Sequence, residues 1–173
     1  MYEHTFPNKR YKKTLEFLNQ NIPKNSSILD LGVVNPFTDF MKNEGYKVQN
    51  TNGEDLDTDT SSIKNSNAEI VTAFEIFEHL LSPLTVLKSI KADKLVASVP
   101  MRLWFSSAYR SKTDQWDRHY HEFEDWQFDW LLEKAGWKII ARDKWTNPTK
   151  KIGIRPFLRL FTPRYYIVYA EKA

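Results

Sequence analysis

The stretch ILDLGVVNPF, residues 28–37, decides the fold that we expect for this chain. Its first half is apolar, as in a buried strand, while Asn35 followed by Pro36 is typical of a helix N-terminus. Gly32 lies between them, where a tight turn favours a residue without a Cβ atom. The stretch therefore predicts a strand over residues 27–33, a turn, and a helix.

Strand and helix patterns alternate along the rest of the chain. Apolar residues recur with helical spacing over residues 9–22, 83–90 and 123–135. Short apolar runs typical of strands cover residues 46–51, 69–74, 94–100, 137–142 and 165–171. The alternation predicts an α/β domain with a mostly parallel sheet. The last two strands have no helical pattern between them, so we expect them to pair antiparallel at one edge.

Composition excludes several classes of function. The chain has 173 residues, of which 41% are hydrophobic and 27% are charged, as in one globular domain. Because cysteine is absent, disulfides, thiolate metal sites and cysteine nucleophiles are excluded. A net charge of +3 does not favour nucleic-acid binding. The N-terminus lacks the apolar core of a signal peptide, and no apolar run is long enough to span a bilayer. We expect a soluble, cytoplasmic protein.

Several motifs together resemble a known enzyme family. They are ILDLG (28–32), GYKV (45–48), AEIVTAFEIFEHL (68–80), ASVP (97–100) and HEFEDWQFDWLLEKAGWKI (121–139). In this combination the chain resembles class I S-adenosylmethionine-dependent methyltransferases, and within them the type 11 and type 23 methyltransferase domains. The resemblance implies a compact, Rossmann-like, doubly wound fold and S-adenosylmethionine as cofactor. It also implies methyl transfer to a small, sugar- or lipid-linked acceptor, which the sequence does not identify.

The resemblance also implies where the cofactor binds, at the carboxyl ends of the parallel strands. Asp30 would order the loop that follows it or meet the cofactor's ammonium group through water, and Gly32 would let the backbone approach closely. The helix that begins at Asn35 favours a carboxylate such as the methionine tail. The implied cofactor-binding residues are Asp30, Gly32, Asn35, Asn52, Asp55, Phe74, Glu75 and Ile76.

The sequence departs from the family pattern at two positions. The usual GxGxG motif is GVVNP here, so Val34 replaces the second glycine. Asn52 stands where the family has an acid that holds the ribose hydroxyls, and Glu54 or Asp55 would take over that contact. Few residues separate Asn52 from the next strand, so we expect a trimmed sheet edge. These departures leave open an alternative, a catalytically silent methyltransferase-like domain that acts as a binding or assembly partner.

Catalytic candidates come from two segments. His79 follows a buried strand, and residues 104–126 are long, polar and aromatic, as in a binding loop. We expect residues 101–122 to act as a lid over the acceptor. The acid–base candidates of this segment are Tyr109, Asp114, Asp117, His119, Tyr120 and His121.

His119 or His121 would deprotonate a hydroxyl acceptor, with His79 as a further catalytic candidate; the alternative is that these histidines only anchor the loop. His119 and His121 would lie on the same side of an extended segment. Because no third ligand stands at a telling spacing, we expect no metal site.

A basic and apolar segment, residues 146–165, lies before the last strand. Its composition suits weak contact with an anionic membrane surface or binding of an anionic substrate. We favour a third interpretation, a crossover packed on the sheet with its charges in solvent. The oligomeric state is not indicated.

Overall fold

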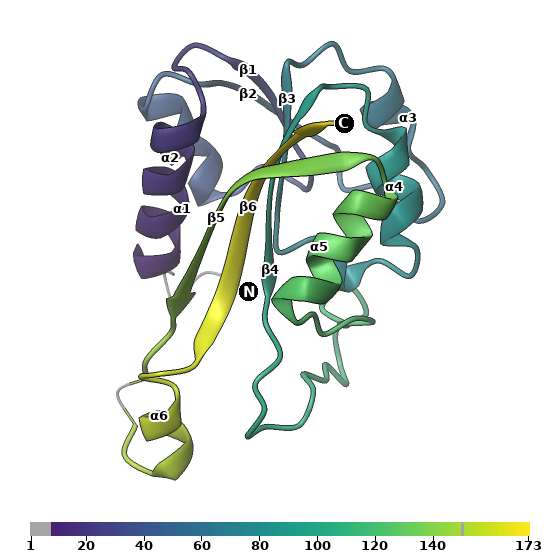
Figure 1. Cartoon of the computed structure of the whole chain (residues 1–173). Helices are drawn as coiled ribbons and strands as arrows, with labels where there is room; N and C mark the ends of the chain where they lie inside the picture. The colour runs from purple at the N-terminus through teal and green to yellow at the C-terminus, as the bar shows by residue number, and fades with distance from the viewer. Residues whose placement is uncertain (1–7, 150) are drawn as a thin grey trace.

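A six-stranded sheet forms the centre of the molecule in the computed structural model, which describes residues 8–149 and 151–173. Its strand order is β2-β1-β3-β4-β6-β5 (Figure 1). The strands are β1 (Ser27–Asp30), β2 (Lys47–Asn50), β3 (Ile70–Phe74), β4 (Lys94–Pro100), β5 (Trp137–Thr146) and β6 (Pro163–Lys172). The first four are parallel, whereas β6 is antiparallel to both β4 and β5. The expected sheet with an antiparallel edge is confirmed.

Helices cover both faces of the sheet (Figure 1). One face carries α1 (Asn8–Asn21) and α2 (Pro36–Asn43); the other carries α3 (Ser61–Lys64), α4 (Pro83–Ser89) and α5 (Asp125–Lys134). Successive strand residues point to opposite faces. Accordingly, Ile28 and Ile70 belong to the core beneath α1 and α2, while Leu29 and Val71 belong to the core on the other side.

The turn after β1 follows the sequence prediction closely. Asn35 caps α2, because its side chain accepts a hydrogen bond from the Phe37 N–H and the Thr38 hydroxyl accepts one from the Asn35 N–H. The strand itself ends at Asp30 rather than at residue 33, because Gly32 adopts a φ of 111° that breaks the extended conformation.

The sheet is trimmed at its β2 edge, as expected. Between β2 and β3 the chain forms turns and the short helix α3, and none of residues 51–69 is in a strand. The loop is held by Asp57, whose carboxylate accepts hydrogen bonds from the N–H groups of Leu81 (2.7 Å) and Ser82 (2.8 Å). The trimmed connection is therefore fixed to the segment that precedes α4.

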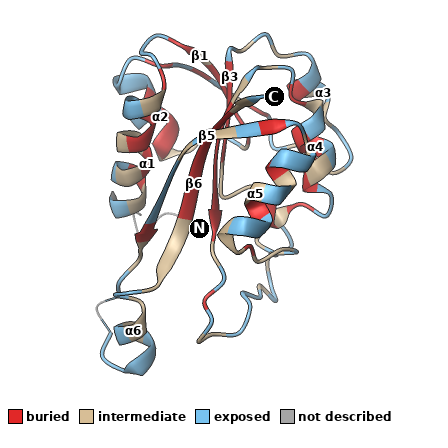
Figure 2. Ribbon diagram, in the orientation of Figure 1, coloured by how far each residue is buried: buried red, intermediate tan, exposed pale blue. Residues whose placement is uncertain are grey.

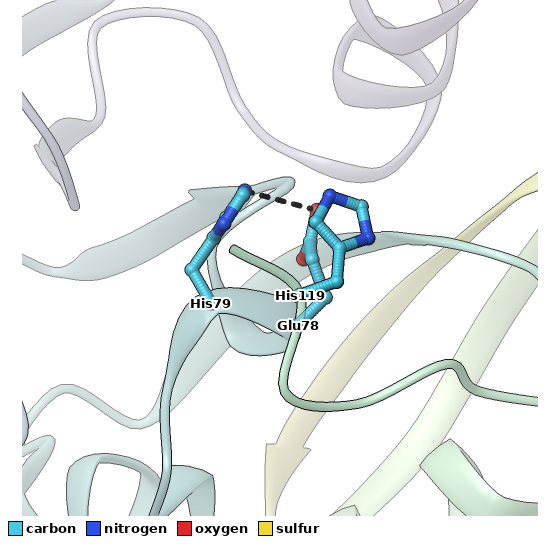
Figure 3. A group of neighbouring side chains, drawn as sticks. All are labelled: Glu78, His79 and His119. Carbon is cyan, nitrogen blue, oxygen red and sulfur yellow. Dashed lines mark ion pairs between the residues drawn. The ribbon is translucent and has the colours of Figure 1, made fainter. Parts of the chain in front are cut away.

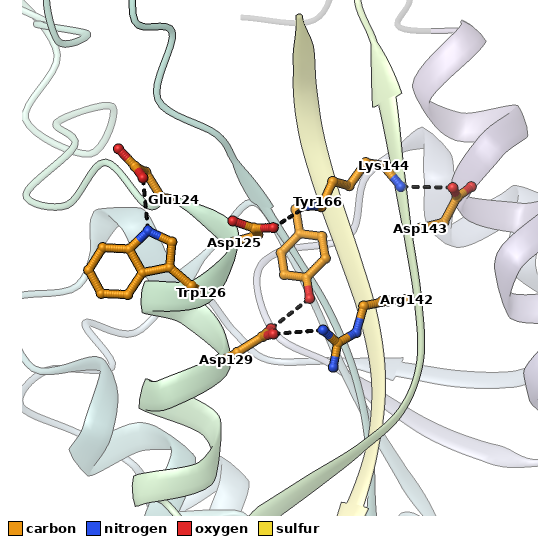
Figure 4. Close-up of polar contacts among 8 residues, drawn as sticks. All are labelled: Glu124, Asp125, Trp126, Asp129, Arg142, Asp143, Lys144 and Tyr166. Carbon is orange, nitrogen blue, oxygen red and sulfur yellow. Dashed lines mark hydrogen bonds and ion pairs between the residues drawn. The ribbon is translucent and has the colours of Figure 1, made fainter.

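Polar contacts fix α5 to the antiparallel edge (Figure 4). Asp129 accepts hydrogen bonds from the Tyr166 hydroxyl (2.6 Å) and from Arg142 (2.9 Å), and Lys144 pairs with Asp125. These contacts hold the start of α5, and with it the end of the long loop that follows β4.

The segment between β5 and β6 differs from its expected placement. It extends past the end of the sheet, and the short helix α6 (Ile154–Leu158) has no buried residue (Figures 1 and 2). Ile152, Ile154, Phe157 and Phe161 are all exposed. The prediction of a crossover packed on the sheet is therefore wrong; Lys150, part of that segment, lies outside the described residues. Among the described helices, none has the length and hydrophobicity needed to cross a membrane.

Candidate active site

The glycine turn is built by the ends of β1 and β2. The Gly32 N–H donates a hydrogen bond to the Thr51 hydroxyl (2.7 Å), and the Gly32 carbonyl accepts one from the Asn50 side-chain amide (3.2 Å). Both peptide groups flanking the turn are therefore held by residues that the sequence analysis did not single out. The sequence signal for these contacts is weak, since it consists only of the polar residues Asn50 and Thr51 at the end of β2.

Asp30 lies beneath this turn and is only 2% exposed. Its carboxylate accepts hydrogen bonds from the Thr72 hydroxyl (2.6 Å) and from the Asn50 amide (3.1 Å). Burial raises the pKa of the Asp30 carboxyl to about 7, although the hydrogen bonds from Thr72 and Asn50 act in the opposite direction. These contacts are those of a residue that orders the loop, one of the two roles considered for it.

The valines that replace the glycine motif do not fill the turn. Val33 is 57% exposed and Val34 is 65% exposed. Glu75 and Asn25 are the only non-glycine residues with positive φ in the described chain, so Val34 keeps an ordinary backbone conformation. The loop thus avoids the strain that a β-branched residue would suffer in a glycine-like conformation.

The Val33 side chain instead reaches the loop after β2. A Cβ added at Gly53 would lie 2.7 Å from Val33 Cγ1, so the two loops are in contact where Gly53 has no side chain. The Asn35 side chain makes two hydrogen bonds within the loop: its oxygen accepts from the Phe37 N–H of α2 (2.9 Å), and its amide donates to the Val33 carbonyl (3.2 Å).

The candidates for the ribose contact lie at the surface after β2. Asn52 and Asp55 are exposed. The Glu54 carboxylate accepts hydrogen bonds from the Asn52 N–H (2.7 Å) and from the Ser62 hydroxyl, and Asp55 accepts one from the Asp57 N–H (3.0 Å). Asn52 is thus the member of this group whose side chain has no hydrogen bond within the described chain.

The end of β3 meets the glycine turn. A Cβ added at Gly32 would lie 3.4 Å from Ile76 Cδ1, so the two segments are in contact. The Phe74 ring packs edge-on against Phe37 at 5.4 Å. Glu75 adopts a φ of 58°, a left-handed conformation that is strained for a residue with a Cβ. The structure therefore brings Gly32 together with Ile76, while Phe74 packs on the helix that follows the glycine turn.

One buried carboxylate, Glu78, and one largely buried carboxylate, Glu75, lie near two arginines. Glu75 accepts a hydrogen bond from the Ser98 hydroxyl (2.9 Å) and pairs with Arg10 of α1 (3.6 Å). Burial raises the pKa of Glu75, against the attraction of Arg10; burial and then the Glu75 charge raise the pKa of Glu78 well above its usual range. Arg164 donates to the Met101 carbonyl (2.5 Å) and also attracts both carboxylates.

The long loop folds back onto the 3-10 turn η1 (Phe77–His79). The N–H groups of Tyr120 (2.8 Å) and His121 (3.2 Å) both donate to the Glu78 carbonyl, and His79 Nδ1 lies 3.0 Å from the Arg118 carbonyl oxygen. The His79 and His119 rings consequently meet edge to face at 4.7 Å, beside Glu78 (Figure 3).

The three catalytic candidates therefore separate into a pair and a single residue. His79 and His119 are together, whereas the His121 ring stacks on Phe123 (5.6 Å). Burial, with a smaller contribution from His79, lowers the pKa of His119 to about 4, so its imidazole is neutral at pH 7. Of the remaining candidates, Tyr109 and Asp117 are hydrogen-bonded to each other.

An open hollow of about 530 Å³ lies between the two limbs of the loop. It is lined by Tyr109, Arg110, Ser111, Lys112, Arg118, His119 and Tyr120. The cationic side chains favour an anionic group, and His119 connects the hollow to η1.

Comparisons with known proteins find the same architecture. No protein-family model matches the sequence, and no curated protein matches it. The fold is similar to that of a SAM-dependent methyltransferase from Archaeoglobus fulgidus, with a TM-score of 0.62, 15% identity and coverage of 94% of both chains. It is similar to an S-adenosylmethionine-dependent methyltransferase from Mesorhizobium loti (TM-score 0.60, 12% identity, 91% of this chain and 96% of that chain).

A third similar structure contains bound molecules. It is the 1,6-didemethyltoxoflavin-N1-methyltransferase of Burkholderia thailandensis, with 1,6-didemethyltoxoflavin and S-adenosylhomocysteine bound. The TM-score is 0.64 at 15% identity, over 94% of this chain and 78% of that chain. At these identities, what the proteins share is the fold.

Proposed function

We propose that this chain, which has the fold of class I S-adenosylmethionine-dependent methyltransferases, binds S-adenosylmethionine and transfers its methyl group to a small, sugar- or lipid-linked acceptor. The observation that carries the proposal is the close approach of Gly32, which follows β1, to Ile76, which follows β3. A turn with positive φ and no side chain at this place leaves the backbone open to close approach.

Each part of the site has a role in this proposal. Gly32 and the N-terminus of α2 receive the methionine carboxylate, Asn52 and Asp55 face the ribose hydroxyls, and Glu75 and Ile76 line the methionine side. The cofactor supplies an activated methyl on its sulfonium, so the protein mainly aligns and desolvates the acceptor. The neutral His119 imidazole accepts a hydrogen bond from the acceptor hydroxyl in the hollow.

Isothermal titration calorimetry with S-adenosylmethionine and S-adenosylhomocysteine tests the proposal. We expect one binding site for each. Binding that is absent from the wild type and is not restored by Val34→Gly together with Asn52→Asp would reject the enzyme. The alternative of a silent domain with a binding role would then stand.

We also propose that the loop over residues 101–122 covers the acceptor, in keeping with its contacts. Its second limb is fixed to η1 through Tyr120 and His121, and its start is fixed by the Arg102 N–H, which donates to the Phe123 carbonyl, and by the buried Leu103; residues 104–117 are the part that we propose moves. Amide hydrogen exchange of this part is expected to slow when cofactor and an acceptor analogue are both bound. Equal exchange with and without saturating ligands would contradict the lid.

The projecting α6 segment supports a second binding role, weak contact with an anionic membrane surface. Apolar Phe157 and Phe161 are exposed beside Arg155 and Arg159, the combination that rests at a lipid interface. We expect co-sedimentation with phosphatidylserine-containing vesicles that weakens in high salt. Phe157→Ser with Phe161→Ser should remove it, while Ile140→Ser, a change of an exposed residue on β5, should not. Equal sedimentation of both variants would contradict this contact.

A further inference from the structure

We propose that Glu78, His79 and His119 form a binding site for a divalent transition-metal ion beside the hollow. The sequence alone paired His119 with its loop neighbour His121 and supplied no third ligand. The fold instead joins His119 to two consecutive residues of η1, which are distant from it in sequence (Figure 3).

The donor atoms of this cluster converge. One ligand atom from each residue can be chosen so that all three lie within 4.8 Å of one another, and His79 Nε2 is 3.7 Å from Glu78 Oε1. Ligands held about 2.0–2.2 Å from a tetrahedral ion are roughly 3.3 Å apart. The donors therefore have to close from within 4.8 Å to this spacing, a change on the scale of side-chain rotation.

The state of Glu78 is a second and independent observation that points to a cation site. Its side chain is 1% exposed, and its Oε2 has no hydrogen-bond partner within the described chain. The buried Nδ1 of His119 is also without a partner there. A buried carboxylate oxygen without a donor is costly, and a bound cation would satisfy it.

The surroundings orient the histidine as they do in metal sites. His79 Nδ1 lies 3.0 Å from the Arg118 carbonyl oxygen, an acceptor only, so Nδ1 carries the proton and donates it. Nε2 then keeps its lone pair available for a metal, at 3.7 Å from Glu78 Oε1. A ligating histidine whose other nitrogen donates to a backbone carbonyl is the usual arrangement around a metal.

The donor set selects the kind of ion. Two imidazole nitrogens and one carboxylate suit Zn²⁺, Mn²⁺ or Co²⁺, whereas Mg²⁺ and Ca²⁺ prefer oxygen ligands. Three protein ligands leave a coordination position open, and His119 also lines the hollow. With an ion bound, the acceptor hydroxyl would occupy that position in place of its hydrogen bond to His119, and it would lose its proton more readily. This last role rests on the proposed function, whereas the metal site does not.

The test is direct metal binding by the full chain after treatment with a chelator. Titration with ZnCl₂ by calorimetry, and with CoCl₂ by its visible absorption, is expected to show one site, with MgCl₂ binding much more weakly. Glu78→Gln and His119→Ala should each lower the affinity by about a hundredfold or more, since loss of even an outer partner of a metal ligand costs up to that factor. His121→Ala and Glu122→Gln, changes of the same chemistry in the same loop, should leave it unchanged.

Two results would overturn the site: absence of one-to-one binding in the wild type, or equal loss in His121→Ala and His119→Ala. The wild-type cobalt spectrum decides the question even where a variant fails to fold, since bands of a four-coordinate nitrogen and oxygen site support it and an aquo-ion spectrum refutes it. All titrations are made without S-adenosylmethionine. Metal binding without cofactor binding would reject only the proposed function, and the reverse would reject only this site.

Discussion

Gly32→Val is expected to abolish binding of S-adenosylmethionine, with at least a hundredfold loss by calorimetry. Gly32 has a φ of 111°, a conformation that a β-branched residue avoids at a cost of about 1–3 kcal/mol. The turn must therefore shift, and the hydrogen bond from its N–H to Thr51 shifts with it. The new side chain would also stand against Ile76, beside the proposed cofactor site.

Gly136→Val is the matched control for this substitution. Gly136 has a φ of 90°, and a Cβ there would meet nothing within 4 Å. It lies between α5 and β5, at the opposite edge of the sheet from the glycine turn, where its carbonyl accepts from the Ala173 N–H. Both variants carry backbone strain, so the melting temperature should fall for both. The affinity for S-adenosylmethionine should fall for Gly32→Val alone. Parallel loss of binding in the two would show that strain, and not the site, is responsible.

Asp30→Asn is expected to raise the free energy of unfolding relative to the wild type, and to raise it more at pH 7.5 than at pH 4. The pKa of Asp30 is about 7 in the folded chain against a usual 3.8, because the carboxyl is fully buried. Below pH 4 both states hold the proton and the wild type keeps its full stability. As pH rises from 4 to 7 only the unfolded chain releases it, so stability falls by about 4 kcal/mol.

The asparagine variant lacks this titration, so the difference in the free energy of unfolding between the variant and the wild type grows with pH. Urea unfolding at both pH values measures it, and the comparison removes the contributions of other carboxyls. Asp93→Asn, a change of an exposed residue, should show no such growth. A difference that stays constant with pH would mean that Asp30 is already ionised in the folded state.

The sequence predicted those parts of the fold that depend on neighbouring residues. Asn35 and Pro36 start α2 because capping is a local event, and the apolar runs of β3 and β4 become strands that are buried on both faces. The trimmed edge followed from chain length alone. Whether Val34 crowds the turn could not be decided from its identity, since that depends on its backbone conformation.

The polar surroundings of the site were not predictable from the same patterns. Arg10 and Glu75 meet only after α1 packs on the sheet, and no periodicity connects them. Glu78 could not be singled out from the sequence, because its burial and its proximity to His119 both depend on the tertiary fold. The α6 segment was misjudged because apolar residues usually become buried, whereas here no layer covers them.

The pairing of Arg10 with Glu75 places a constraint on how the first helix can vary through evolution. Inserting a single residue between Arg10 and Ile22 rotates Arg10 by about 100° about the helix axis. The guanidinium would then leave the carboxylates of Glu75 and Glu78, and Arg164 would be the remaining arginine that attracts them. Exposed positions such as Lys12 are free to change, but the number of residues between Arg10 and the end of α1 at Asn21 is fixed by the need to place the Arg10 charge beside Glu75.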